Sequence, residues 1–255
     1  MKKLITICLC VLFAVGTAAE GSIGFLEDFS GPVLDPAWTV TDTYPGHGYY
    51  SLTGNSLRYY VQAWSQPGDT PTPPNEWGYV YYPSMKLSRS FSGTDWTFET
   101  KVTYYMPYSN GRSLNMWVCF GSRDNSIVFV RGADQAGGGA SAGTISWAST
   151  IDGVTQQGNL PVSGTDYDTD YFRILREDKE LTLLWSSGGQ NWSSLYNTQM
   201  SDSTAQASQY VLLGGASWAT PAGSYADYDY ISVIPEPATI VLLTLGGLLL
   251  RKSRR

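Results

Sequence analysis

The sequence predicts an all-β protein, folded as a two-sheet antiparallel β-sandwich. Apolar and polar residues alternate over short stretches, which is the period of a strand with one buried face. Clusters of Gly, Ser, Asn and Asp separate these stretches, as turns between strands require. The 27 Gly, 18 Tyr and 9 Trp residues suit strands and turns better than helices. Many short strands of this kind pack as two sheets around one core.

The individual strands follow from the alternation. In residues 97–104, Phe98, Val102 and Tyr104 share one face, whereas Glu99 and Lys101 share the other. The clearest hairpin joins 171–176 to 181–186 through a turn at 177–180. Two long segments rich in Gly, Pro, Ala or Ser, at 65–76 and 132–143, are expected to be loops, which in a compact domain are often functional. Further strands are expected at 114–120, 127–131, 192–196, 210–213 and 228–233, with turns at 122–125 and 187–191.

Residues 1–19 have the features of a secretory signal peptide. Lys2 and Lys3 precede an apolar stretch at 4–15, and small residues follow up to Ala19. This order is that of an export signal, so we expect signal peptidase to cleave after Ala19.

The segment 235–255 forms a second targeting signal. Pro235-Glu236-Pro237 precedes an apolar run at 238–250 and a basic tail. A helix over that run would be about 20 Å long, shorter than a hydrocarbon core of roughly 30 Å, and the tail suits the cytoplasmic face. This order resembles the PEP-CTERM sorting signal of exopolysaccharide-forming Gram-negative bacteria. The resemblance implies a transient inner-membrane association, processing by exosortase and delivery to the cell surface or extracellular matrix. An ordinary tail anchor is the alternative.

Between these signals, residues 20–234 are expected to form one domain. Two of the 16 Lys and Arg residues lie in the first signal and four in the second, whereas only one of the 22 acidic residues, Glu236, lies outside the domain. The domain therefore holds 10 basic and 21 acidic residues, a net charge of −11. This charge argues against a nucleic-acid partner, which requires clustered cations. Cys119 is the one cysteine of the domain and is expected to be a small packed residue.

Three motifs of the domain resemble concanavalin A-like lectin/glucanase domains. Residues 27–31 and 34–38 resemble the opening of these domains, residues 172–192 resemble an Arg-x-x-Arg strand followed by a Ser-x-Gly-Gly hairpin, and residues 225–233 resemble the closing strand. The resemblance implies a concanavalin A-like jelly roll. It also implies that three tryptophans of these motifs are core residues, namely Trp38, Trp185 and Trp192.

The catalytic members of this fold carry Glu-x-Asp-x-(x)-Glu on one strand, where retaining hydrolysis needs carboxylates about 5–5.5 Å apart. The sequence contains no such strand. The acidic cluster at 177–180 falls in a predicted turn, where its side chains should face solvent, and the acidic residues at 166–170 suit a loop or calcium ligands better than a catalytic pair. We therefore expect no catalytic residues. The alternatives are a divergent polysaccharide-degrading enzyme and a purely structural envelope protein.

A structural Ca²⁺ ion is the cofactor that the resemblance implies, because an ion often ties the first strand to the last in such domains. By motif position the ligands would be Asp28 and Asp229. The alternative is that Asp28 caps a turn and Asp229 is merely exposed.

The predicted ligand is a polysaccharide or exopolysaccharide, because sugar rings stack on aromatic side chains. Trp117 and Asn115 alternate with Leu114, Met116, Val118 and Phe120, so we expect Trp117 on an outer sheet face. Trp64 and Trp77 flank the Pro-rich loop and could form a rim. The alternative is that these aromatics pack in the core or against loops. The sequence thus predicts a non-catalytic glycan-binding protein.

Overall fold

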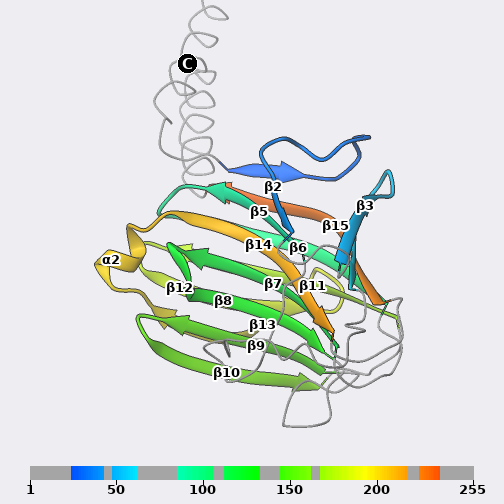
Figure 1. The fold of residues 1–255 in the computed structure, drawn as a ribbon. Coiled ribbons are helices and arrows are strands. Elements are labelled where there is room, and N and C mark those ends of the chain that lie inside the picture. Colours follow the sequence, from blue (N-terminus) through cyan, green and yellow to red (C-terminus); the bar gives the residue numbers. More distant parts are fainter. Residues whose placement is uncertain are drawn as a thin grey trace, which may run out of the picture.

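The computed structural model describes residues 24–42, 48–61, 85–105, 112–132, 144–161, 167–217 and 224–235. In these ranges the protein consists of two antiparallel β-sheets packed face to face, with one short helix (Figure 1). The predicted all-β sandwich is therefore confirmed.

The first sheet, sheet A, brings the beginning and the end of the domain together. The order of its strands is β13-β12-β11-β6-β15-β4-β3, and β1 pairs with β15 beyond β4. Residues 224–228 of β15 pair with β4, and residues 231–233 pair with β1. The strands are β1 (Phe25–Glu27), β3 (Gly48–Leu52), β4 (Leu57–Val61), β6 (Trp96–Tyr105), β11 (Tyr167–Glu177), β12 (Glu180–Ser186), β13 (Ser193–Gln199) and β15 (Ser224–Pro235).

The second sheet, sheet B, has the strand order β10-β9-β8-β7-β14-β5-β2. Figure 1 shows β5, β14, β7, β8, β9 and β10 side by side, and the short helix α2 (Asp202–Ala205) at one end of the sandwich, between β13 and β14. The strands are β2 (Thr39–Asp42), β5 (Met85–Phe91), β7 (Arg112–Phe120), β8 (Ser122–Gly132), β9 (Thr144–Ile151), β10 (Val154–Pro161) and β14 (Gln209–Ser217).

The core lies between the sheets, and its residues follow the predicted alternation. The inward-facing side chains of β6 and β7 are at most 2% exposed. The rings of Phe129 on β8 and Phe172 on β11 stack across the two sheets, with centroids 4.4 Å apart. Burial of each such side chain stabilises the fold by about 1.5–3 kcal/mol. The inward residues of β6 and β7 include Phe98, Val102, Tyr104, Met116, Val118 and Phe120.

A tight hairpin turn anchors one end of sheet B to α2. Asp152 and Gly153, which connect β9 to β10, have φ angles of 52° and 75°, as an Asp-Gly turn of type I′ requires. The Asp152 carboxylate accepts hydrogen bonds from the Ser201 N–H (2.6 Å), the Ser201 hydroxyl (2.7 Å) and the Thr204 hydroxyl (2.5 Å). The turn residue therefore fixes the N-terminus of the helix.

Some local predictions differ from the structure. Residues 122–125, expected to form a turn, belong to β8, and the ladder between β7 and β8 shifts register between Cys119 and Phe120. Glu177, Asp178 and Glu180 are exposed at the tip of the hairpin that β11 and β12 form, as predicted. The predicted loop 65–76 lies outside the described residues.

Candidate functional site

The outer face of sheet B is the surface on which Trp117 was expected. Met116 and Val118 point into the core, whereas Trp117 packs in a separate cluster, so the side of the sheet assigned to it is confirmed. Trp117 lies directly opposite Leu212 of β14 and Val128 of β8. Val128 lies opposite Ala148 of β9. We call this line across four strands the apolar row (Leu212, Trp117, Val128 and Ala148).

The exposure expected for Trp117 is not found. Its indole is 5% exposed, and Leu212, Val128 and Ala148 are 5%, 4% and 8% exposed. Cross-strand neighbours on one face of a sheet pack against one another, and the small side chains of Cys119 and Ala148 leave room for a large ring. A sugar ring requires an open ring face, so this indole contributes to packing and not to an exposed platform.

The other residues predicted for the glycan site are only partly described. Asn115 lies on β7, opposite Gly214 of β14 and Val130 of β8. Its side chain does not belong to the part of the chain that the structure describes. Trp64 and Trp77 lie outside the described residues.

A second row on the same face is mostly polar. It consists of Tyr210, Cys119, Ser126 and Thr150, which lie opposite one another on β14, β7, β8 and β9. Cys119 is fully buried, as predicted for a small packed residue. Neither this row nor the apolar row contains a carboxylate or a histidine.

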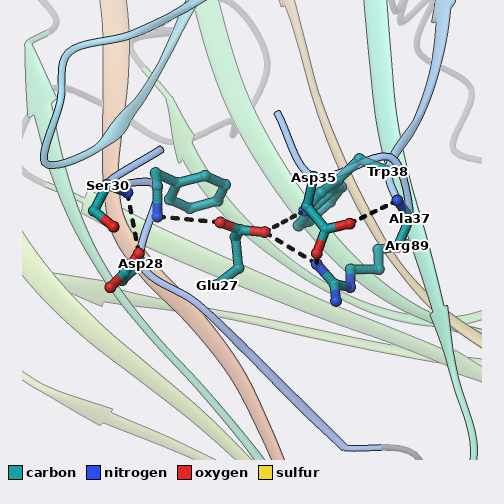
Figure 2. Close-up of polar contacts among 8 residues, drawn as sticks. Glu27, Asp28, Ser30, Asp35, Ala37, Trp38 and Arg89 are labelled. Carbon is teal, nitrogen blue, oxygen red and sulfur yellow. Dashed lines mark hydrogen bonds and ion pairs between the residues drawn. The ribbon is translucent and has the colours of Figure 1, made fainter. Parts of the chain in front are cut away.

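The opening motif forms a polar network around Arg89 of β5 (Figure 2). One guanidinium nitrogen of Arg89 donates to Glu27 Oε2 and to Asp35 Oδ2, at 3.0 Å each. The Trp38 indole N–H donates to the same Glu27 oxygen at 3.3 Å. The hydrogen bond from the Ala37 N–H is the main cause that lowers the pKa of Asp35, and Arg89 adds to it against the effect of burial. Both carboxylates thus share one guanidinium and also accept N–H hydrogen bonds from within the motif, which indicates a structural role.

The two predicted calcium ligands have different partners in the structure. Asp28 accepts a hydrogen bond from the Ser30 N–H at 3.0 Å, which is the main cause that lowers its pKa. Asp229 forms an ion pair with Lys101 of β6. Within the described residues, no group of three or more Asp, Glu, His or Cys side chains could hold a metal ion. Because Ca²⁺ takes six to eight oxygen ligands, the described donors do not fit such a site, and the calcium site stays a prediction.

The outer face of sheet A carries paired charges. Glu99 of β6 accepts hydrogen bonds from Arg173 of β11 (2.9 Å) and from the Tyr230 hydroxyl (2.6 Å). The Arg173 guanidinium lies 3.9 Å from the centre of the Trp192 ring. Trp192 was expected in the core, and this expectation is wrong, because the ring covers Arg173 on the outer face. Trp38 is 5% exposed, and Trp185 packs against the core, as predicted.

A row of tyrosines, which was not predicted from the sequence, crosses the end of sheet A. Tyr49 of β3 lies opposite Tyr60 of β4, Tyr60 lies opposite Tyr225 of β15, and Tyr225 lies opposite Tyr105 of β6. We call these four residues the tyrosine row. The high tyrosine content was the one signal in the sequence, but strand pairing was needed to align residues that are far apart along the chain.

Pro235, the first residue of the predicted sorting motif, belongs to the last strand of sheet A. Pro235 ends β15 opposite Trp96, whereas Glu236 and Pro237 lie outside the described residues. Among the residues that the structure describes, no helix is long and apolar enough to cross a membrane. The apolar run 238–250 is outside this range, so its expected membrane association stays a prediction.

The sequence matches no protein-family model and no curated protein. The structure is similar to an endo-β-1,3-glucanase from Pyrococcus furiosus, with a TM-score of 0.58 and 16% identity over 83% of this chain and 93% of that one. It is also similar to the catalytic domain of an endo-1,3-β-glucanase (laminarinase) from Thermotoga petrophila, with a TM-score of 0.57 and 13% identity over 83% and 98% of the two chains.

A third similar structure is the GH43 protein BlXynB from Bacillus licheniformis, with a TM-score of 0.56 and 13% identity. The match covers 82% of this chain but 39% of the GH43 protein, so this chain spans about two fifths of that protein's length. Identities this low establish the shared fold alone. The protein has the β-sandwich fold of these carbohydrate-active enzymes.

Proposed function

We propose that this protein is an exported, non-catalytic glycan-binding protein of the cell surface or extracellular matrix. The main support for this proposal is the composition of the outer face of sheet B. The apolar row and the mostly polar row beside it contain no carboxylate. A glycosidase needs two carboxyl groups on either side of the scissile bond, about 5–5.5 Å apart for retention or about 6.5–9.5 Å apart for inversion. The glucanase-type fold supports a carbohydrate ligand, and the composition of the two rows supports binding without cleavage.

The carboxylates of the opposite face also favour a non-catalytic role. On the outer face of sheet A, Glu99, Asp227 and Asp229 form ion pairs with Arg173, Arg58 and Lys101. A catalytic acid must be available to donate a proton to the leaving group. Because each of these three carboxylates is paired with a cation, we assign them a role in stabilising the sheet and not in catalysis.

Export and sorting complete the proposal. Signal peptidase would remove residues 1–19, and exosortase would cleave near Pro235-Glu236-Pro237 after a transient stay in the inner membrane of a Gram-negative bacterium. The two prolines restrict the backbone of this motif to extended conformations, which suits a protease. We expect mass spectrometry of the surface-exposed protein to show a chain without the basic tail, and an intact Arg255 on that form would contradict processing.

A glycan array tests the proposed function. The exported protein, labelled and applied to an array of β-glucans, xylans, xyloglucans and the exopolysaccharide of the producing bacterium, should bind at least one of them. Heat-denatured protein is the control. Absence of binding to every glycan would overturn the proposal.

A further inference from the structure

We propose that the tyrosine row on the outer face of sheet A is the contact surface for a neutral polysaccharide. This inference rests on the proposed glycan-binding function and places the contact on the sheet opposite to the one that carries Trp117. The observations that support it are the alignment of the rings, the exposure of Tyr49 and the neutralised charge beside the rings.

The four rings form a continuous series across neighbouring strands. Tyr49 and Tyr60 stack with centroids 4.2 Å apart and planes at 16°. Tyr60 and Tyr225 are 5.8 Å apart, and Tyr225 and Tyr105 are 5.2 Å apart. Neighbouring strands lie about 4.8 Å apart, which is close to the length of one sugar unit. An extended glycan that crosses the strands would therefore pass the edges of successive tyrosine rings and could stack on the open face of Tyr49 at the end of the series.

The edge of the row is accessible. Tyr49 lies on β3, which ends the strand order of sheet A, and the residue is 43% exposed. One face of its ring stacks on Tyr60, so a sugar ring on the other side would extend the stack. Trp117, in contrast, is 5% exposed, and its ring is already surrounded by protein.

The charge beside the rings is neutralised. The Arg58 guanidinium lies 3.9 Å from the centre of the Tyr225 ring. It also donates two hydrogen bonds of 2.7 Å to the Asp227 carboxylate, a bidentate geometry that fixes both groups. Next along this line of the sheet, the hydroxyls of Thr103 and Thr169 are hydrogen-bonded at 2.9 Å. Polar groups of fixed position thus accompany the aromatic carbons.

A neutral polysaccharide fits this combination better than other partners. The net charge of −11 on residues 20–234 repels polyanions, and the paired Arg58 offers no free cation to an acidic glycan. An apolar peptide or lipid would cover the ion pair and the hydroxyls without satisfying their hydrogen bonds, which costs free energy. A sugar presents apolar C–H faces to the rings and hydroxyls to the polar groups.

The test is affinity electrophoresis of the exported protein in gels that contain laminarin, xyloglucan or alginate. Tyr49→Ala removes the accessible ring, Tyr49→Phe keeps the ring without its hydroxyl, and Val154→Ala is a control at an exposed residue of sheet B. We expect Tyr49→Ala to weaken binding of a neutral glycan about tenfold, whereas Tyr49→Phe and Val154→Ala keep the affinity. Melting temperatures of all variants verify that the fold is intact. Alginate should not retard the wild type.

Each outcome distinguishes the inference from the proposed function. If the wild type binds a neutral glycan and Tyr49→Ala binds it equally well, the tyrosine row is not the contact surface, although the proposed function stands. If only alginate retards the protein, the neutral class is wrong. If the wild type binds no glycan and sedimentation shows a dimer that Tyr49→Ala dissociates, the row is a self-association surface and both proposals fail.

Discussion

At the scale of single residues, exposure decides what an aromatic side chain can do in this protein. Trp117 and Tyr49 both lie on outer sheet faces, but their exposed fractions are 5% and 43%. The buried indole has already lost its water, so its removal should affect stability. The exposed phenol still has surface to offer, so its removal should affect binding.

Truncation of Trp117 to alanine should lower the free energy of unfolding by about 3–5 kcal/mol, because the large side chain leaves a cavity among Leu212, Val128 and Ala148. Urea unfolding measures this loss. The matched control is Trp192→Ala, which removes a ring that stacks on Arg173 and should cost only about 0.5–1 kcal/mol. An unchanged stability together with a loss of glycan affinity would return Trp117 to the binding site.

At the scale of elements, the sandwich is held by contacts between structures that are distant in sequence. The turn between β9 and β10 is joined to α2 through Asp152. Nearby, Trp147 of β9 stacks on Tyr196 of β13 with centroids 4.7 Å apart, so the edge strand of sheet A contacts the strand next to the edge of sheet B through aromatic rings. The stability that the Asp152 contact provides should depend on pH, whereas the stability that the Trp147–Tyr196 contact provides should depend on how tightly the rings pack.

The contact of Asp152 should make stability depend on pH. Burial raises its pKa, but the hydrogen bonds from Thr204 and Ser201 outweigh burial and lower the pKa below 3.8. A lowered pKa means that the ionised carboxylate stabilises the fold above pH 3.8, and that this contribution is lost as the pH falls through the lower pKa of the folded state. The difference in urea midpoint between wild type and Asp152→Asn should therefore be larger at pH 7 than near pH 3. Equal differences at both pH values would exclude this role.

A methyl group added at Gly158 should disturb the stacked rings of Trp147 and Tyr196. Gly158 of β10 lies opposite Trp147, and a Cβ atom there would be 2.7 Å from the indole Nε1. Gly158→Ala should therefore lower the free energy of unfolding by about 1–3 kcal/mol. Gly188→Ala is the matched control, because a Cβ there meets nothing within 4 Å and should change little. Equal melting temperatures for the two variants would contradict the packing.

The sequence predicted strands where one face is buried and the other is exposed. β6, β11 and β12 have this alternation, and strands were predicted at these positions. β10 was not predicted, because its residues Val154–Pro161 are mostly polar and it pairs on one side only, with β9. The side of the sheet occupied by Trp117 followed from alternation, but its burial did not, since burial depends on partners from β14 and β8. For the same reason the tyrosine row could not be predicted, because it requires the order of β3, β4, β15 and β6.

At the scale of the whole molecule, both ends of the domain meet on one strand. β1 pairs with the end of β15, and a Cβ atom on Gly24 would lie 2.5 Å from Pro235 Cδ. Gly24 therefore lies beside Pro235, the first residue of the predicted sorting motif. Backbone pairing joins the first strand to the last.

Chelation of metal ions should leave the melting temperature unchanged. Asp229 is paired with the Lys101 ammonium, which opposes a divalent cation, and Asp28 accepts from the Ser30 N–H. Scanning calorimetry with and without EDTA measures the effect. A lower melting temperature in EDTA that calcium restores would establish the ion predicted from the sequence.

The central claim is that the protein binds a glycan and does not cleave it. Native mass spectrometry of the exported protein, incubated with oligosaccharides of a glycan that it binds on the array, reports both properties in one spectrum. We expect a complex whose mass is the sum of the protein and the intact oligosaccharide. Shortened oligosaccharides that accumulate with time, or a spectrum of unbound protein alone, would contradict it.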